Sequence, residues 1–366
     1  ELMGDIELFA HAASAPVVAV TGSNGKTTVT TLLGEMLNAA GVRVEVGGNI
    51  GVPALELLSR PVPDYYLLEL SSFQLETVSS LNAVAAVVLN LSADHLDRHL
   101  SLQQYSELKA KIFQGDGVVV FNRDDPLVVQ QVLLSEVSRQ RISFGLSASL
   151  SAAAWGVEKF AAKEWLVRGG EQVVAISSLA MSGRHNIANI AAAFALADAL
   201  GVNSRDAWQA MAAVAISFKG LPHRLQHVTT LHGVEWYNDS KGTNVGATVA
   251  AINGMTEEKM VLLAGGVGKG ADFSPLEPVV NERCRAVLLF GVDGPLLQQA
   301  LGNTIPIERV ETLDEAVKRA AELALPGDAV LLSPACASFD QYKNYSERGD
   351  HFQKLVVRMG MGYAAY

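Results

Sequence analysis

The first 140 residues alternate between short apolar runs and amphipathic segments. Residues 17–20, 65–70, 83–91 and 118–122 are runs of apolar residues that predict buried strands. Helical periodicity between them predicts helices over residues 29–40, 103–113 and 125–138. Strands that alternate with helices in this way are typical of an α/β fold with a mostly parallel sheet.

The pattern changes twice further along the chain. Residues 142–180 form short alternating segments separated by Gly and Ser, which predict a small antiparallel appendage, and helices are expected over 186–200 and 204–214. Turn residues in the phrase FKGLPHR at 218–224 mark a boundary. A new strand and helix series follows, with strands expected at 261–264, 286–290, 307–310 and 329–333. We therefore expect two α/β domains, residues 1–220 and 221–366, the second of them Rossmann-like.

Composition narrows the class of partner. The chain has 366 residues, of which 49% are hydrophobic and 18% charged, with a net charge of -10, so it is a globular protein and not a general nucleic-acid binder. No apolar run is long enough to span a bilayer, and no signal peptide is expected. Two cysteines, Cys284 and Cys336, fit a reducing cytoplasm. These features predict a cytoplasmic protein that binds small molecules.

The phrase TGSNGKTT at residues 21–28 lies between the first expected strand and a helix. It is shorter than the usual GxxxxGK[ST] phosphate loop, because valine stands at position 20. The strand before it and the helix after it still predict a nucleotide-binding loop. The residues expected at the phosphates are Gly22, Asn24, Gly25, Lys26, Thr27 and Thr28, and a hydroxyl of Thr27 is placed to bind Mg²⁺.

Two further strands end in polar residues. Glu69 closes the second apolar run, and the third runs into Asp94, His95 and Asp97. Carboxyl ends of parallel strands meet at one edge of a sheet, where ligands bind, so Glu69 and His95 are candidate metal ligands. His99 is expected to be structural or exposed.

Several phrases together resemble the Mur ligase family. They are TGSNGKTT, NIG at 49–51, ELSSFQLE at 69–76, DHLDRH at 94–99, GRHNIAN at 183–189, GLPHR at 220–224, NDSKGTN at 238–244, GGVGKGADF at 265–273 and LLSPACASFDQYKNY at 331–345. The last two phrases are most similar to the branch that adds D-glutamate to UDP-N-acetylmuramoyl-L-alanine in peptidoglycan synthesis. The resemblance spans nearly the whole chain.

The resemblance implies an ATP-dependent amide ligation through an acyl phosphate, with Mg²⁺ as cofactor. It implies that Lys26, Thr27, Glu69 and His95 act on the γ-phosphate and Mg²⁺, and that His223 lies near the acyl phosphate. The residues implied at the nucleotide are Asn186 and Asn189, three apart on one helix face, and Arg224 and Asp239. Those implied at D-glutamate are Thr243, Lys269, Ser338, Phe339 and Tyr345, with Lys241 in the same region.

The charge pattern around Lys109 and the family resemblance predict different roles for this residue. Its neighbours Glu107 and Lys111 are charged, which by itself favours a solvated helix face. The resemblance instead implies a carbamylated lysine that supports a second Mg²⁺. The modification predicts a mass gain of about 44 Da under CO₂.

The family also carries an N-terminal domain that grips the UDP part of the substrate. This chain opens at Glu1, almost at the nucleotide-binding domain. We therefore expect only the edge of that site, at Asn49, Ser71 and Gln74, and impaired ligation by this chain alone. A monomer is expected.

Two alternatives stay open. The first is another Mur ligase or a folylpolyglutamate synthase, which would differ in amino acid or acceptor. The second is a nucleotide-dependent switch or binding protein, which would hydrolyse or exchange nucleotide without an acceptor. That second reading leaves the glycine–lysine and serine-rich turns of the second domain unexplained.

Overall fold

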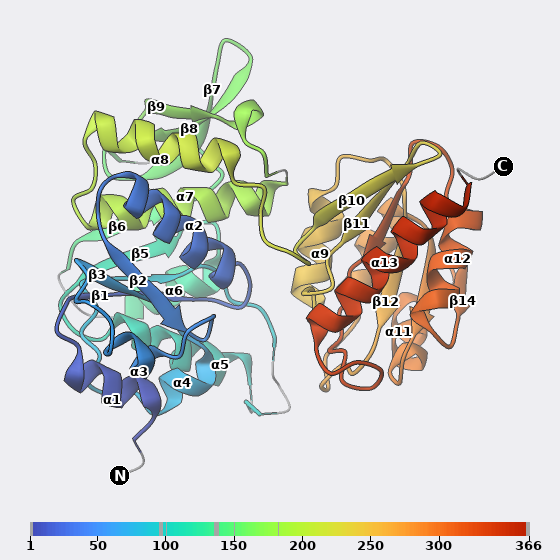
Figure 1. The fold of residues 1–366 in the computed structure, drawn as a ribbon, viewed down its shortest axis with the longest axis horizontal. Helices are drawn as coiled ribbons and strands as arrows, with labels where there is room; N and C mark the ends of the chain where they lie inside the picture. The colour runs from blue at the N-terminus through green and yellow to red at the C-terminus, as the bar shows by residue number, and fades with distance from the viewer. Residues whose placement is uncertain are drawn as a thin grey trace. The chain divides into compact units, whose positions relative to one another are not determined.

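The computed structural model describes residues 3–94, 98–99, 101–134, 139–149, 151–181 and 183–363. The chain forms two compact units (Figure 1). The first contains Glu1–Ser92 and His99–Lys219, and the second contains Gly220–Tyr366 together with Ala93–Arg98.

The first unit is built on a nine-stranded sheet in the order β2-β3-β1-β4-β5-β6-β7-β8-β9. Neighbouring strands from β2 to β7 pair in parallel, whereas β7, β8 and β9 pair antiparallel. The antiparallel appendage predicted within residues 142–180 is therefore present, although β6 at its start belongs to the parallel part of the sheet. The strands are β1 Val17–Thr21, β2 Val44–Gly48, β3 Tyr65–Glu69, β4 Ala85–Val88, β5 Val118–Asn122, β6 Arg141–Phe144, β7 Trp155–Phe160, β8 Lys163–Arg168 and β9 Glu171–Ala175.

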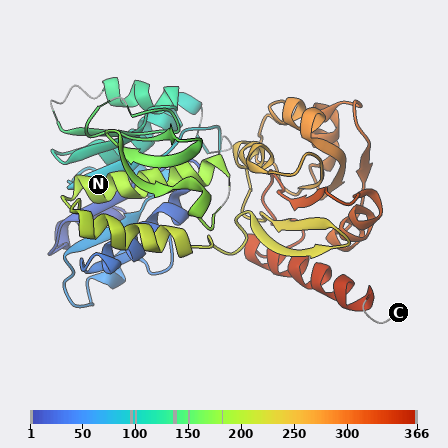
Figure 2. The ribbon, with the colours of Figure 1, turned by 90° about the horizontal axis from the view of Figure 1, so that it is seen from above.

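Helices cover both faces of this sheet (Figures 1 and 2). Val17 and Ala19 of β1 join a core with Ile6 and Phe9 of α1. On the other face, the alanine-rich α7 packs against β4 to β7 and α2. The helices are α1 Asp5–Ala12, α2 Lys26–Ala39, α3 Ala54–Leu57, α4 Ser72–Glu76, α5 Leu102–Ala110, α6 Pro126–Leu134, α7 Arg184–Ala199 and α8 Arg205–Ser217, with short 3₁₀ turns at Lys111–Phe113 and Ile176–Ser178. Because both faces are covered, the central strands are apolar on both sides.

The second unit has a six-stranded sheet in the order β10-β11-β15-β12-β13-β14. Only the edge strand β10 is antiparallel. The strands are β10 Gln226–Leu231, β11 Val234–Asn238, β12 Met260–Gly265, β13 Cys284–Phe290, β14 Ile307–Arg309 and β15 Ala329–Leu332. The helices are α9 Val245–Gly254, α10 Leu276–Arg283, α11 Gly294–Leu301, α12 Leu313–Leu323 and α13 Tyr345–Tyr363, with α9 to α11 on one face and α12 and α13 on the other.

The four strands expected in each half of the chain are present, and the α/β prediction is confirmed. Strand β2 and the hairpin β10–β11 were not predicted. Their sequences contain Glu45, Gly47, His227 and Glu235, which interrupt the apolar runs that the other strands show. None of the helices within the described ranges combines the length and the apolar character required to cross a bilayer.

Candidate active site

The phosphate loop joins the buried strand β1 to the start of α2. Gly25 precedes the helix with a left-handed φ of 83°, and a β-carbon added to it would stand 2.4 Å from Asn189 Oδ1. Lys26 Nζ donates to the carbonyl oxygens of Gly22 (2.7 Å) and Ser23 (2.9 Å), so its ammonium curls back over the loop. The loop therefore presents a helix N-terminus and a cation at one point, which suits an anion.

Asn90, which follows β4, fastens this loop. Its side-chain oxygen accepts from Asn24 N at 2.8 Å, and its Nδ2 donates to Asn24 O at 3.0 Å. Its backbone oxygen also accepts from Ser23 N. Sequence reasoning did not single out Asn90. It is a polar residue just beyond a buried strand, as Glu69 is a polar residue at the end of one, and that signal could have identified it.

Two asparagines at the start of α7 lie next to the loop. Asn189 is buried and contacts Gly25, and its Nδ2 donates to Asn186 Oδ1 at 3.4 Å. The spacing of three residues had predicted one shared helix face, and the two side chains do meet.

Glu69 is the last residue of β3, and its side chain is buried, with only 2% of the residue exposed. The parallel pairing of Gly48 with Glu69 brings Asn49 alongside, and Asn49 Nδ2 donates to Glu69 Oε1 at 3.0 Å. Glu69 Oε2 is buried and has no hydrogen-bond partner among the described residues. A buried carboxylate oxygen without a hydrogen-bond partner destabilises the folded protein unless a ligand or an ion binds to it.

Lys109 lies inside the first unit and not on a solvated helix face, so the pattern of charges around it was misleading. It is 1% exposed, its Nζ donates to Thr21 Oγ1 at 3.2 Å, and it lies 4.8 Å from the centre of the Tyr105 ring. Thr21 Oγ1 in turn donates to Leu70 O. The long aliphatic stem of Lys109 turns inward from α5, while Glu107 stays on the exposed face and bonds Gln103.

His99 is buried beside Tyr105, in keeping with the expected structural role. Its Nε2 lies 2.9 Å from Ser72 Oγ, and its ring stacks on Phe73 and meets Tyr105. His95, expected as a metal ligand, lies outside the described residues. The described part of the chain contains no group of three or more His, Cys, Asp or Glu side chains arranged around a common metal position.

Ser71 and Gln74 form the capping box of α4. Ser71 Oγ accepts from Gln74 N, and Gln74 Oε1 accepts from Ser71 N. Gln74 Nε2 donates to Asp5 of α1. Both side chains were expected at the substrate, and in this structure they also define where α4 begins.

The second unit gathers its candidate residues at the carboxyl ends of its strands. Asp239, after β11, is buried; its oxygens accept from Ser333 Oγ (2.7 Å) and Leu225 N (3.1 Å), and burial raises its pKa to about 7.

Lys269 has a left-handed φ of 55° in the loop after β12. Ser338 is buried, whereas Phe339 beside it is 73% exposed. Thr243 N donates to Lys241 O in the turn that leads into α9.

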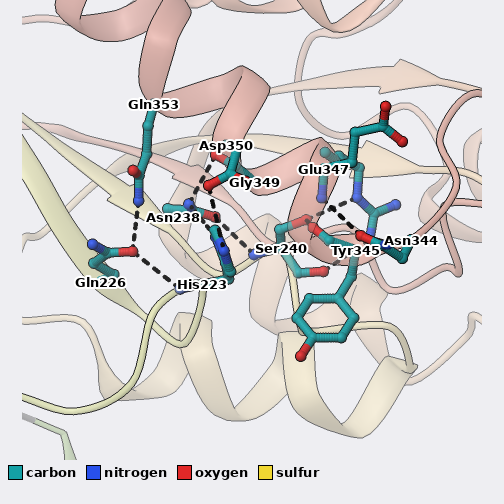
Figure 3. A network of polar contacts seen from close by, with 11 residues as sticks. His223, Gln226, Asn238, Ser240, Asn344, Tyr345, Glu347, Gly349, Asp350 and Gln353 are labelled. Atoms are coloured by element: carbon teal, nitrogen blue, oxygen red, sulfur yellow. Dashed lines mark hydrogen bonds and ion pairs between the residues drawn. The ribbon is translucent and has the colours of Figure 1, made fainter.

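Tyr345 and His223 meet at the start of α13 (Figure 3). Lys241 Nζ lies 4.1 Å from the centre of the Tyr345 ring, and the His223 ring meets Tyr345 edge to face at 6.1 Å. Burial lowers the pKa of the His223 imidazole, Asp350 opposes this, and Arg224, which follows His223 directly, lowers the pKa further.

Arg348 was missed by sequence reasoning. It is fully buried, and burial lowers its pKa to about 10. Its guanidinium donates to Ser240 Oγ (3.0 Å), to Ser240 O (2.9 Å) and to Cys336 O (3.2 Å). It therefore ties the loop after β11 to the loop after β15. One arginine inside a charged helix gives no sequence signal for such a role.

Two protein-family models match this chain. Residues 20–197 match the Mur ligase middle domain, and residues 223–336 match the glutamate ligase domain of Mur ligases. UDP-N-acetylmuramoylalanine–D-glutamate ligase of Nitrosococcus oceani is 51% identical over 356 residues, covering 97% of this chain and 77% of the relative. The protein of the same name from Pseudomonas aeruginosa is 50% identical over 361 residues, covering 98% and 79%.

Solved structures show the same fold at lower identity. MurF from Acinetobacter baumannii aligns with a TM-score of 0.72 at 19% identity, covering 94% of this chain and 78% of its own. Escherichia coli FolC in complex with ADP aligns with a TM-score of 0.68 at 17% identity, covering 98% and 95%. With half of its residues shared across almost its entire length, this chain belongs to the Mur ligase family.

Proposed function

We propose that this protein is an ATP-dependent ligase that joins D-glutamate to UDP-N-acetylmuramoyl-L-alanine in peptidoglycan synthesis. The observation that carries the proposal is the assembly of a phosphate loop, the buried Glu69 and the buried Lys109 at one edge of the first sheet. The names of relatives at about half identity supply the substrates.

The loop fits a nucleotide. Gly25 allows the chain to turn in a left-handed conformation against Asn189, and Lys26 sits where phosphate oxygens would meet the N-terminus of α2. We propose that Gly22, Asn24, Thr27 and Thr28 complete the phosphate site, with Asn186 and Asn189 close to it. From the second unit, we propose Arg224 and Asp239 as further nucleotide ligands.

Glu69 fits Mg²⁺. The cation prefers carboxylate and hydroxyl oxygens, and Glu69 Oε2 is a buried carboxylate oxygen without a hydrogen-bond partner among the described residues. We propose that Glu69 and Thr27 hold Mg²⁺, and that His95 contributes as the family resemblance implies. When bound, Mg²⁺ would neutralise charge on the phosphates.

We also propose that Lys109 is carbamylated. The neutral amine would attack CO₂, forming an N–C bond and releasing one proton. The observation behind this proposal is that Lys109 is buried beside Thr21 and Tyr105 and does not lie on a solvated helix face. Intact mass under CO₂, or ¹³C NMR with labelled bicarbonate, tests it; an unmodified Lys109 in the active, CO₂-equilibrated enzyme would reject it.

The chain's own residues would act mainly by positioning and by neutralising charge. The carboxylate of UDP-N-acetylmuramoyl-L-alanine attacks the γ-phosphorus of ATP, and the bond to ADP breaks. The amine of D-glutamate then attacks the acyl carbon, phosphate leaves, and the amine loses a proton. We propose Lys26 and His223 at the transferring phosphoryl group. For D-glutamate we propose Lys269, Thr243, Ser338, Phe339 and Tyr345, with Lys241 beside them.

Phosphate release measured with each acceptor and amino acid tests the function. We expect release only when ATP, UDP-N-acetylmuramoyl-L-alanine and D-glutamate are all present, and not with L-glutamate, L-alanine or diaminopimelate. Release with another amino acid would indicate a sister ligase, and hydrolysis without any acceptor would indicate a nucleotide switch. The expected monomer and cytoplasmic location stay predictions.

A further inference from the structure

His223 is fixed in place from several sides. It has a left-handed φ of 63°, and its ring is mostly buried against α13. The approach is close at Gly349, where an added β-carbon would stand 2.3 Å from His223 Nδ1. A glycine inside a helix costs stability, and here its absence of a side chain makes room for the imidazole. Figure 3 shows these residues together.

Asn238, the last residue of β11, determines which nitrogen of His223 carries the proton. Asn238 Oδ1 accepts from Ser240 N at 3.1 Å, and Asn238 Nδ2 donates to Gly349 O at 3.1 Å. The first partner can only donate and the second can only accept, so the orientation of the amide is fixed. The same Nδ2 lies 3.0 Å from His223 Nδ1 (Figure 3). Because an amide nitrogen is only a donor, His223 Nδ1 must be an acceptor and carries no proton.

We propose that His223 works as a neutral imidazole with its proton on Nε2, and that Asn238 is the positioning residue that holds it in this form. Nε2–H is then available to donate to an oxygen of the transferring phosphoryl group. The inference rests on the proposed ligase function for the identity of that acceptor, and on the hydrogen bonds of Asn238 for the tautomer.

The charged surroundings of His223 agree with a neutral ring. Asp350 of α13 has Oδ1 3.7 Å from Nε2, and its side chain is largely exposed. Arg224 lies next in the chain, Lys241 N donates to His223 O, and Tyr345 meets the ring edge. Burial and Arg224 lower the pKa of His223, while Asp350 opposes them.

A chemical consequence follows from the occupied Nδ1. A neutral imidazole whose acceptor nitrogen is already hydrogen-bonded to Asn238 is not placed to take a proton from the incoming amine. His223 would therefore stabilise charge by donation, and the proton of the amine would leave by another route.

Nitrogen NMR of the whole protein with ¹⁵N-labelled histidine tests the proposal. The chain has eight histidines, and the signals lost in His223→Gln identify the relevant pair. From about pH 6 to pH 8, where histidine usually titrates, we expect Nδ1 to show the shift of an unprotonated nitrogen and Nε2 that of a protonated one. A protonated Nδ1 would overturn the proposal.

Asn238→Asp supplies the decisive variant. A carboxylate can accept both from Ser240 N and from a protonated Nδ1, so we expect Nδ1 to gain a proton and the imidazolium to persist to higher pH. Asp350→Asn is the control, and should leave Nδ1 unprotonated. A folded Asn238→Asp protein with an unchanged Nδ1 shift would reject the role of Asn238.

A second pair of variants serves if Asn238→Asp does not fold. Gly349→Ala should push the ring away from Asn238 and change the Nδ1 shift. Gly360→Ala is the matched control, because it lies in the same helix and its β-carbon would meet only the end of the flexible Leu231 side chain. Unchanged shifts in Gly349→Ala would contradict the proposal. These spectra do not depend on activity, so an inactive wild-type protein with the expected shifts would reject the ligase function alone.

Discussion

Gly25 and Asn189 are in direct contact, although they lie far apart in the sequence. A β-carbon on Gly25 would stand 2.4 Å from Asn189 Oδ1. The start of α7 therefore rests on the turn of the phosphate loop, and both the shape of the loop and the position of the asparagine depend on this glycine.

Gly25→Ala should weaken both folding and ATP binding. The left-handed backbone alone costs a residue with a side chain about 1–2 kcal/mol, and the clash with Asn189 adds to that. Gly41→Ala is the matched control, because Gly41 has the same φ of 83° with nothing within 4 Å of an added β-carbon. Urea unfolding and ATP titration measure the difference.

Removing the side-chain amide of Asn189 tests its contact with Gly25 in a second way. Gly25→Ala combined with Asn189→Ala should recover part of the lost stability, since the nearest atoms to the added carbon belong to Asn189. Equal losses in Gly25→Ala and Gly41→Ala, with unchanged ATP binding, would show that the contact does not matter.

Glu69→Gln should separate stability from metal binding. Glutamine keeps the acceptor for Asn49 and removes a buried charge, so the free energy of unfolding should not fall. The apparent affinity for Mg²⁺ in the presence of ATP should drop by on the order of 10- to 100-fold. Thermal unfolding with ATP, with and without Mg²⁺, measures both effects. An undiminished Mg²⁺ shift would remove Glu69 from the metal site.

Asp239→Asn should change how stability depends on pH. Burial raises the pKa of Asp239 from the ordinary 3.8 to about 7, so the folded protein favours the neutral carboxyl. The stability that the neutral Asp239 carboxyl contributes is complete below about pH 4 and is lost as pH rises through about 7. Its upper limit is about 4 kcal/mol. The variant should therefore be the more stable protein at about pH 8, and should match wild type at about pH 4.

The control for this change is Asp272→Asn. Hydrogen bonds from Ser274 lower the pKa of the exposed Asp272, so the stability that its carboxylate contributes is complete above about pH 4 and is lost only as the pH falls below that value. The difference in stability between Asp272→Asn and wild type should therefore stay constant from about pH 4 to about pH 8. Urea unfolding of the three proteins across this pH range gives the comparison. Parallel curves for wild type and Asp239→Asn would contradict a buried neutral Asp239.

Tyr345→Leu should raise the KM for D-glutamate. The Tyr345 ring lies 4.1 Å from Lys241 Nζ, and a contact of this kind contributes about 0.5–1 kcal/mol, which corresponds to about a two- to five-fold change. Tyr345→Phe retains the aromatic face and should stay close to wild type. If KM for ATP rises instead, Tyr345 belongs to the nucleotide site.

Sequence reasoning located the strands and the residues that follow them, because buried parallel strands are apolar along their whole length. Glu69 and the phosphate loop were identified in this way. Strand β2 was overlooked because glutamate and glycine break its pattern, and yet it brings Asn49 to Glu69. Pairing between strands is a long-range property that a local pattern does not contain.

The burial of Lys109 and the amide orientation of Asn238 could not be predicted from the sequence either. A charged residue between other charged residues predicts an exposed face, and only the packing of α5 against Thr21 and Tyr105 reverses this. The orientation of Asn238 depends on Ser240 and Gly349, and Gly349 is more than a hundred residues away. The family resemblance supplied Lys109 as a candidate where residue patterns did not.

The attachment of the phosphate loop to Asn90 bears on the thermodynamics of nucleotide capture. Asn90 exchanges two hydrogen bonds with Asn24 and accepts a third from Ser23, so the loop has little freedom left to lose. The entropy of ordering that segment is given up once, as the first unit folds, and not at each encounter with ATP. Binding should then show a small entropic penalty at the loop, and loosening Asn90 should weaken affinity without touching any group that contacts the nucleotide.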